Sequence, residues 1–238
     1  MTGGDRGGRR RSRGGSRTRL RPLCALLTRG PHGAVITFDT LLEPVATILI
    51  GYLLGSVPFG LLLTRLAGLG DVRAIGSGNI GATNVLRTGR KGLAAATLAL
   101  DAAKGAAAVL IVQALWPDMA QLAPLAGLSA FLGHLYPAWL GFRGGKGVAT
   151  LIGVVAALLW PAALVIAAVW IAALLASRYS SVGGMAAAVA APVAAFLLDR
   201  FDLALLFAGF ALLVLWKHRA NLGRLFRGTE PRVGRASR

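Results

Sequence analysis

Long uncharged apolar segments dominate the chain from residue 44 onward and restrict its possible folds more than any other feature. Residues 44–64, 119–142 and 179–198 contain no Asp, Glu, Lys or Arg. A helix needs about 20 apolar residues to cross the hydrocarbon core of a bilayer. Because backbone polar groups must pair with each other in lipid, such segments predict helices. We therefore expect an all-α, polytopic membrane helix bundle.

The composition supports a membrane protein. Hydrophobic residues make up 55% of the 238 residues and charged residues only 15%, compared with about 25% charge in soluble domains. The net charge of +17 would normally suggest nucleic acid. However, Lys and Arg lie at the chain ends and in short loops between apolar segments, which is typical of membrane proteins. We therefore predict no nucleic-acid partner.

The N-terminal segment has a different composition. Residues 1–34 are rich in Arg, Gly and Ser and contain nine arginines but one acidic residue, Asp5. Such a segment cannot bury a core, so we predict a disordered basic tail over residues 1–43. The sequence leaves open whether translation starts near Val35 instead, just before the first apolar segment.

The segment 147–177 decides the number of helices, because its 31 residues are long for one helix and short for two. Trp160-Pro161 near its middle would break or turn a helix. Basic residues favour the cytoplasmic side of a membrane. Two helices here place the basic loops 65–91 and 143–146 and the C-terminal tail on one side. We therefore predict about seven transmembrane helices in a bundle over 44–217, followed by a cytoplasmic motif and tail over 218–238.

The first polar cluster follows the first apolar segment. Gly76, Gly78 and Gly81 match the G-x-G-x-x-G pattern of dinucleotide-binding proteins, but that motif requires a preceding strand, which this context lacks. Closely spaced glycines let backbone N–H groups converge on an anion, and Arg87 can grip a phosphate with two hydrogen bonds. The neutral donors beside them are Ser77, Asn79, Thr83 and Asn84. The alternative is a simple polar connector.

The second cluster contains His134 and, further on, Arg143-Gly144-Gly145-Lys146. These residues open an apolar segment and suggest an anion cradle at a helix N-terminus. A Walker A loop is excluded, because glycine follows the lysine where Ser or Thr should stand. The alternative is a tight basic turn. The segment Arg178-Tyr-Ser-Ser181 is expected at the same membrane face, lining the site.

The third cluster follows the last apolar segment and contains His218, Asn221 and Glu230. Attraction to a membrane surface does not explain these three residues. We interpret His218 as an anion contact or a base, and residues 232–238 as a solvated basic tail.

Two further observations concern chemistry inside the bundle. Asp101 and Lys104 lie one helical turn apart in an apolar segment, where charges are costly and either pair or serve function. With three histidines and one cysteine, the chain offers no metal-ligand pattern, and we predict neither metal nor cofactor.

The three clusters occur together and in order, as Gly76-Ser-Gly-Asn-Ile-Gly-Ala-Thr-Asn84, Gly133-His-Leu-Tyr-Pro137 with Phe142-Arg-Gly-Gly-Lys-Gly-Val-Ala-Thr150, and His218-Arg-Ala-Asn221 with Gly228-Thr-Glu230. In this respect residues 44–231 resemble the bacterial acyl-phosphate:glycerol-3-phosphate acyltransferase family (PlsY type). The sequence departs from the family pattern in Arg143, where Lys is common, and in its N-terminal tail.

The resemblance implies a seven-helix enzyme of the bacterial cytoplasmic (inner) membrane with its active site facing the cytoplasm. It implies acyl transfer from a fatty acyl phosphate to the 1-hydroxyl of glycerol 3-phosphate, giving lysophosphatidic acid and inorganic phosphate, the first step of phospholipid synthesis. Membrane lipid is the expected surrounding, and a functional link to the enzyme that produces acyl phosphate is a further expectation. The alternative is a transporter of a phosphate-bearing anion, whose polar groups should lie near the membrane midplane.

The site residues are assigned accordingly. Catalytic roles are expected for Ser77, Arg87, Lys146 and His218. Phosphate binding is expected for Gly76, Gly78, Asn79, Thr83, Asn84, Arg143, Gly144, Gly145 and Asn221. His134 and Glu230 are expected to support them. The general base stays open between His218 and a phosphate oxygen of the substrate, which we favour.

Overall fold

The Trp160-Pro161 break divides the longest apolar segment into two helices, as predicted. In the computed structural model, which describes residues 38–234 and the side chains of residues 41–234, α6 (Val148–Leu158) ends before the break and α7 (Trp160–Ser177) begins at it. Leu159 between them is extended, with φ of −156°. Pro161 lies in the first turn of α7, where a missing N–H costs no helical hydrogen bond. The prediction of two helices over residues 147–177 is confirmed.

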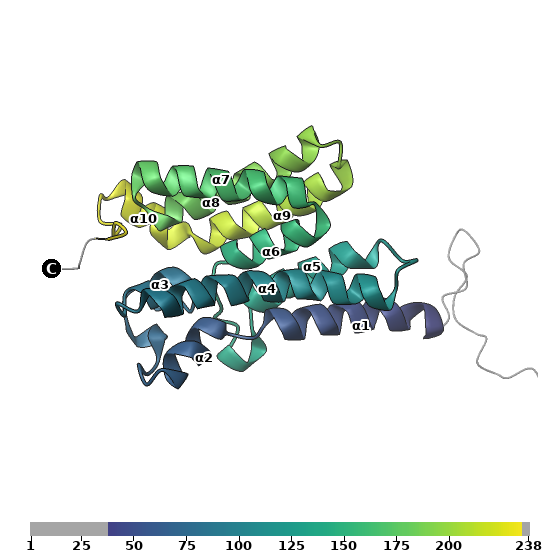
Figure 1. Cartoon of the computed structure of the whole chain (residues 1–238), viewed down its shortest axis with the longest axis horizontal. Helices are drawn as coiled ribbons and strands as arrows, with labels where there is room; N and C mark the ends of the chain where they lie inside the picture. Colours follow the sequence, from purple (N-terminus) through teal and green to yellow (C-terminus); the bar gives the residue numbers. More distant parts are fainter. Residues whose placement is uncertain (1–37, 235–238) are drawn as a thin grey trace, which may run out of the picture. The chain divides into compact units, whose positions relative to one another are not determined.

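Helices form all the regular structure among the described residues (Figure 1). Besides α6 and α7, the elements in chain order are α1 (Phe38–Gly55), α2 (Phe59–Leu66), the 3-10 turn η1 (Val72–Ala74), α3 (Ala82–Leu86), α4 (Lys91–Leu115), α5 (Leu122–Leu135), the 3-10 turn η2 (Ala138–Leu140), α8 (Ser180–Leu197), α9 (Phe201–Lys217) and α10 (Arg219–Phe226). Residues 41–234 belong to one compact unit. The all-α prediction is confirmed.

The first helix starts earlier than predicted. Helix α1 begins at Phe38, within the range 1–43 that the sequence assigned to the tail. Leu41 and Leu42 extend the apolar segment beyond Pro44, so the helix continues through that proline. The predicted disorder of the tail and the alternative start at Val35 lie outside the described residues.

The helices differ in their ability to cross a membrane. Four spans are long and apolar enough by length and composition: Leu41–Leu66, which combines α1 and α2, then α4, α7 and α8. Helix α9 is long and apolar enough to count as a membrane span only together with α10, and the two helices are bent by 56° relative to each other. Helices α5 and α6 have 14 and 11 residues and are shorter than a full crossing requires. The seven predicted segments are therefore all helical, but two of them are short.

Small residues bring the helices into backbone contact. A Cβ atom at Gly153 of α6 would overlap the backbone of Ala102 in α4, and one at Gly105 would lie 2.6 Å from the Thr150 carbonyl oxygen. Helix α8 buries a row of alanines among its neighbours. Small residues at helix interfaces are typical of membrane bundles, in which association depends on close packing.

Large apolar side chains cover the outside of the bundle. Leu175, Leu205 and Leu212 are 73%, 79% and 69% exposed, whereas the Phe131 and Phe210 rings pack inside at 4.4 Å between centroids. An outer surface rich in exposed leucines would be unfavourable in water but is favourable in contact with lipid chains.

The polar loops gather at one end of the bundle, which we call the motif end: residues 67–90, 136–147, 178–179 and 218–234. In Figure 1, α2, α3 and α10 lie toward this end, away from the start of α1. Two contacts join loops distant in sequence: Thr83 Oγ1 lies 2.8 Å from Ser180 Oγ, and the Val233 amide donates to the Arg178 carbonyl oxygen at 2.8 Å. The prediction that the three clusters share one end of the bundle is confirmed.

Candidate active site

The first glycine-rich loop is organised around Asn84. The Asn84 amide group points at the carbonyl oxygens of Val72 (2.8 Å), Ile75 (3.1 Å) and Asn79 (2.9 Å), and its Oδ1 accepts from the Ser77 amide at 3.0 Å. Asn84 is buried, with 1% of its surface exposed. Its hydrogen-bonding groups are used within the protein, so Asn84 holds the loop in shape. The prediction that it binds phosphate directly is not supported.

The loop glycines serve the turn and the approach of Arg87. Gly76 and Gly78 have φ of +54° and +68°, which favours glycine. A Cβ at Gly76 would lie 2.5 Å from Arg87 Nη1 and 2.5 Å from Asn84 Oδ1. The Gly78 amide donates to the Ile75 carbonyl oxygen, and the Gly81 amide to Asn79 Oδ1. Three amides of the expected cradle, those of Ser77, Gly78 and Gly81, are therefore already paired within the protein.

The second glycine-rich loop packs against the end of α5. The Gly144 amide donates to the Leu135 carbonyl oxygen at 3.2 Å, and the Gly145 amide to that of His134 at 3.0 Å. A Cβ at Gly145 would overlap the His134 ring. Both of these amides are therefore paired within the protein. Lys146 and Gly147, at the start of α6, line the cleft instead, and the anion cradle predicted for this segment stays a prediction. Arg143 is exposed and does not line the site, which corrects its predicted role.

Lys146 connects this loop to the third cluster. Its Nζ donates to Asn221 Oδ1 at 2.6 Å, and Asn221 Nδ2 donates to Glu230 Oε1 at 2.6 Å. Glu230 also accepts from Ser181 Oγ (2.7 Å) and from Arg224 Nε (2.7 Å). The Glu230 carboxylate thereby joins α8, α10 and the C-terminal segment, which matches its predicted supporting role.

The C-terminal segment after Glu230 contacts the bundle. Arg232 Nε donates to the Tyr179 hydroxyl at 3.2 Å, and its guanidinium lies 5.4 Å from the centre of that ring. Val233 pairs with the Arg178 carbonyl oxygen. The interpretation of residues 232–238 as a solvated tail is therefore wrong at its start, and residues 235–238 lie outside the described residues.

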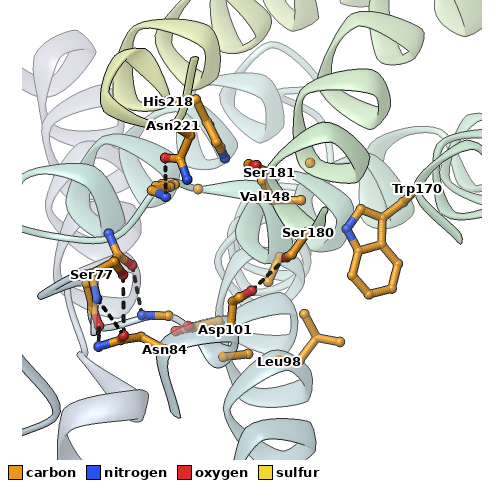
Figure 2. A pocket seen from close by; sticks show the side chains of 18 of the residues that line it. Ser77, Asn84, Leu98, Asp101, Val148, Trp170, Ser180, Ser181, His218 and Asn221 are labelled. Atoms are coloured by element: carbon orange, nitrogen blue, oxygen red, sulfur yellow. Dashed lines mark hydrogen bonds between the residues drawn. The ribbon is translucent and has the colours of Figure 1, made fainter. Parts of the chain in front are cut away.

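These side chains surround a cleft at the motif end (Figure 2). It encloses about 830 Å³ of non-protein space, part of it open to solvent. The predicted site residues that line it are Ser77, Asn79, Thr83, Asn84, Arg87, His134, Lys146, His218, Asn221 and Glu230. Those that do not are Gly76, Gly78, Arg143, Gly144 and Gly145.

The cleft also has lining residues outside the three clusters. Of the segment 178–181 that was expected to line the site, Ser180 and Ser181 line the cleft, whereas Arg178 and Tyr179 do not. Leu98 of α4 and Trp170 of α7 line it as well, and with Val148 they give part of its wall an apolar character. The sequence analysis missed Leu98 and Trp170, because nothing distinguishes them from other apolar residues of their helices.

His218 is a neutral hydrogen-bonding group. Burial and the positive charge of Lys146 lower the pKa of His218 to about 4. At pH 7 its ring is therefore uncharged, and Nδ1–H donates to the Val214 carbonyl oxygen at 2.8 Å. Nε2 is left as an acceptor, and Figure 2 shows the ring directed toward Ser181. This arrangement suits a substrate hydroxyl better than the anion contact that the sequence suggested.

The ammonium group of Lys146 loses its proton more easily than that of an ordinary lysine. Burial lowers its pKa to about 8; Arg224 and Arg87 act in the same direction, and Glu230 opposes them. Glu230 itself is ionised: burial alone would raise its pKa, but hydrogen bonds from Asn221, Ser181 and Arg224 outweigh burial and lower it. The negative charge of a substrate phosphate next to Lys146 would stabilise the protonated form of the lysine.

A second cavity adjoins the cleft. Ser77, Asn79, Lys146 and Asn221 line both spaces and form the wall between them. The far side of the second cavity carries Lys217, Arg219 and Arg224, and no carboxylate from the described residues lines it. Two adjacent spaces with basic side chains therefore meet at Lys146. Within residues 38–234, no group of three His, Cys, Asp or Glu residues is placed to hold a metal ion.

The comparisons with known proteins agree with this geometry. A family model described as "Glycerol-3-phosphate acyltransferase" matches residues 45–228. The glycerol-3-phosphate acyltransferase of Mesorhizobium japonicum is 58% identical over 190 residues, covering 80% of this chain and 96% of the relative. The protein of the same name from Brucella anthropi is 55% identical, covering 80% and 93%.

Two crystal structures are similar in fold. Both are of PlsY (YgiH), an integral membrane glycerol 3-phosphate acyltransferase, one in a glycerol 3-phosphate form and one in a lysophosphatidic acid form. The TM-scores are 0.76 and 0.74, at 36% and 35% sequence identity. Each match covers 81% of this chain and 96% of the crystallised one.

Proposed function

This chain belongs to the glycerol-3-phosphate acyltransferase family, and we propose that it transfers a fatty acyl group from acyl phosphate to the 1-hydroxyl of glycerol 3-phosphate. The products are lysophosphatidic acid and inorganic phosphate. The observation that carries the proposal is the pair of adjacent cavities that share Lys146 and Asn221, one lined also by Arg87 and the other by Lys217, Arg219 and Arg224. Two phosphate-bearing substrates must meet in this reaction, and the shared wall would hold their phosphates side by side.

The cleft also suits the acyl donor. Leu98, Val148 and Trp170 provide apolar surface on helices α4, α6 and α7, against which an acyl chain can lie. Arg87 lines the same cleft and offers the planar fork that binds phosphate with two hydrogen bonds. A transporter would hold its substrate near the membrane midplane, whereas Arg87 and Lys146 lie in loops at the motif end, so we set that alternative aside.

The reaction needs no covalent enzyme intermediate, because acyl phosphate is already an activated anhydride. The glycerol 1-oxygen forms a bond to the acyl carbon while the bond from that carbon to the phosphate oxygen breaks, and the departing phosphate keeps the electron pair. Lys146 and Arg87 stabilise the phosphate charge, and the cleft orients the two substrates. His218 Nε2 accepts a hydrogen bond from a substrate hydroxyl. With a pKa of about 4 His218 is a weak base, so a substrate phosphate oxygen takes the proton.

The test uses the purified full chain in lipid nanodiscs with acyl phosphate and glycerol 3-phosphate. Equal amounts of lysophosphatidic acid and inorganic phosphate are expected, and acyl-coenzyme A should not replace the donor. Transfer from acyl-coenzyme A at an equal rate would overturn the assignment of the donor.

The absence of an acyl-enzyme is tested separately. Rapid quench with labelled acyl phosphate, without glycerol 3-phosphate, should leave no label on the protein. Stoichiometric label on Ser77 would replace direct transfer with a two-step route through an acyl-serine.

We further propose that the chain resides in the bacterial cytoplasmic membrane with its motif end facing the cytoplasm. The basic side chains of this end, or of the helical residues within two positions of it, are Arg65, Arg73, Arg87, Arg90, Lys91, Arg143, Lys146, Arg178, Lys217, Arg219, Arg224, Arg227 and Arg232. The opposite turns at residues 116–121 and 198–202 contain Asp118, Asp199 and Asp202 with one base, Arg200. This asymmetry follows the positive-inside rule and would place the site where soluble glycerol 3-phosphate is available.

Single cysteines at the exposed positions Arg143, Thr229 and Asp118, with Cys24 replaced by serine, test this orientation. Impermeant thiol reagents added to intact cells should label only the cysteine at Asp118. Labelling at Thr229 from outside would contradict the orientation.

A further inference from the structure

Helix α4 carries a buried ion pair at the wall of the cleft, where Asp101 is one of the lining residues, and the acyl-transfer steps above assign it no role. Asp101 and Lys104 are 3% and 5% exposed, and Lys104 Nζ lies 2.7 Å from Asp101 Oδ1. Both lie in a helix that is long and apolar enough to cross a membrane. Charges at such depth are costly, and a pair kept there needs an explanation.

The ion pair connects α4 to three other parts of the bundle. Lys104 Nζ donates at 2.7 Å to the carbonyl oxygen of Val57, at the break between α1 and α2. Thr150 Oγ1 of α6 donates to the Asp101 carbonyl oxygen at 3.0 Å. On α5, His134 Nδ1 lies 3.7 Å from Asp101 Oδ1, and this buried nitrogen has no hydrogen-bond partner among the described residues. The His134 ring therefore faces the ion pair with one of its edges.

The other side of His134 supports the loop that carries Lys146. The His134 carbonyl oxygen accepts from the Gly145 amide, and the ring occupies the space that a Cβ at Gly145 would need. Lys146 follows directly, and its Nζ reaches Asn221. The contacts thus lead from the ion pair through His134 to Gly145, the residue before Lys146, and Asp101, His134 and Lys146 all line the same cleft.

We propose that Asp101, Lys104 and His134 are positioning residues for Lys146: the ion pair fixes the His134 ring, and the ring fixes the backbone that delivers the Lys146 ammonium into the cleft. This rests on the proposed function in one respect, namely that Lys146 binds a substrate phosphate. A salt bridge suits this purpose because its loss leaves a buried charge without compensation, so the pair tolerates few arrangements. Apolar side chains in the same place could pack in several ways.

The experiment compares three variants in nanodiscs. His134→Ala removes the ring, and the double variant Asp101→Asn with Lys104→Met removes both charges of the pair together. Ser129→Ala is the matched control, since Ser129 is a buried polar residue of α5 that bonds only to its own helix, at Leu125. For each variant, calorimetry with glycerol 3-phosphate and with inorganic phosphate gives the affinity from pH 7 to pH 10, and steady-state kinetics give kcat and both KM values.

The expected result is at least a tenfold loss of affinity for both probes in the first two variants, with kcat reduced less than threefold and the control unchanged. The pH above which affinity declines should also rise by about one unit. The charged groups facing Lys146 are Glu230, Arg224 and Arg87, and none of them is altered. A displaced lysine would regain solvent, which moves its pKa back toward the ordinary value.

Three results would overturn the proposal. The first is unchanged affinity in a folded variant, and the second is a loss of affinity without a shift in the pH profile. The third is a fall in kcat above a hundredfold with unchanged KM, because this would indicate direct catalysis. If His134→Ala does not fold, His134→Phe keeps a ring of similar size without the nitrogen opposite Asp101. It should still lose affinity about threefold or more, and no loss would likewise contradict the proposal.

The binding arm also separates this proposal from the proposed function. If wild-type protein fails to use acyl phosphate, the identity of the donor is wrong, while the effect of His134 on the affinity for phosphate still tests the positioning of Lys146.

Discussion

The two glycine-rich loops of the motif end resemble each other in sequence but are built in different ways. The loop at residues 76–84 folds around its own Asn84, whose side chain bonds to three carbonyl oxygens of the same segment. The loop at residues 143–147 has no such internal organiser and takes its shape from the end of α5, against which Gly144 and Gly145 pack. Gly78 of the first loop permits a turn, and Gly144 and Gly145 of the second permit close contact with α5. Gly76 and Gly147 combine a positive φ with a close neighbour.

The comparison teaches that a glycine-rich sequence near a basic residue does not by itself identify an amide cradle for an anion. In both loops, many of the amides that could bind phosphate already bond to protein oxygens. Each loop is associated with one cation of the cleft, Arg87 at the end of the helix α3 that follows the first loop and Lys146 within the second. The predictions that follow test this difference.

The largest effect is expected when a methyl group is added to each loop. Gly145→Ala places its Cβ in the His134 ring, so the loop must move, and we expect more than a hundredfold loss of kcat/KM. Gly78→Ala meets open space, with its nearest contact 3.5 Å away at the Arg73 carbonyl oxygen. Its positive φ of +68° costs about 1–2 kcal/mol, and the loss should stay near tenfold. Steady-state assays of both variants provide the measurement, and equal losses would remove the distinction between the loops.

The second-largest effect on activity is expected at Asn84, whose side chain holds the first loop in shape. Asn84→Asp replaces the donor group that faces three carbonyl oxygens by an acceptor, which leaves buried acceptors unpaired at about 1–3 kcal/mol each. We expect roughly a thirtyfold fall in activity and faster cleavage of the loop in limited proteolysis. Thr83→Ser, at an exposed position of the same loop, should change neither, and normal protease resistance of Asn84→Asp would contradict the interpretation.

Substrate binding should depend on the planar shape of the Arg87 side chain as well as on its charge. Arg87→Lys retains the charge but loses the planar fork, so the KM for a phosphate-bearing substrate should rise about tenfold. Arg143→Lys is the matched control, because Arg143 is exposed and lies outside the cleft. Unchanged KM values in Arg87→Lys would show that Arg87 acts only as a point charge or does not contact substrate.

The cations of the two loops should differ in their response to pH. Burial lowers the pKa of Lys146 to about 8, so the free enzyme loses this charge as the pH rises through 8 and keeps it below. Affinity for inorganic phosphate should fall about fivefold between pH 8 and pH 9, since the charged form decreases by that factor. Lys146→Arg stays charged and should flatten the profile even if its affinity is lower at pH 7. Titration calorimetry checks both, and an identical decline in the arginine variant would exclude Lys146 as its cause.

The smallest effect is expected outside both loops. Removal of residues 1–34 should change membrane insertion and activity less than twofold, because this segment contains none of the site residues. Membrane fractionation and the acyltransferase assay of the shortened chain provide the test. A folded but inactive product would assign the tail a role that neither loop supplies.

Much of the fold was predictable because lipid imposes simple rules on sequence. Uncharged segments of sufficient length must be helical, and Trp160-Pro161 marked the division between α6 and α7. The start of α1 was not predictable from Pro44, since a proline early in an apolar segment need not end the helix. Most polar residues that line the cleft were predicted from the sequence, because Arg87, Lys146 and His218 stand out as polar residues in loops between apolar segments.

The sequence by itself determined that this protein is a membrane helix bundle and which loops carry its chemistry, because hydropathy and residue type are local properties. Only the tertiary structure decided what the glycines do, since a free amide and a paired amide have the same sequence. It also decided that Leu98 and Trp170 border the cleft and that His134 stands between the Asp101–Lys104 pair and Lys146. These relations depend on contacts between helices distant in the chain, and no single segment contains them.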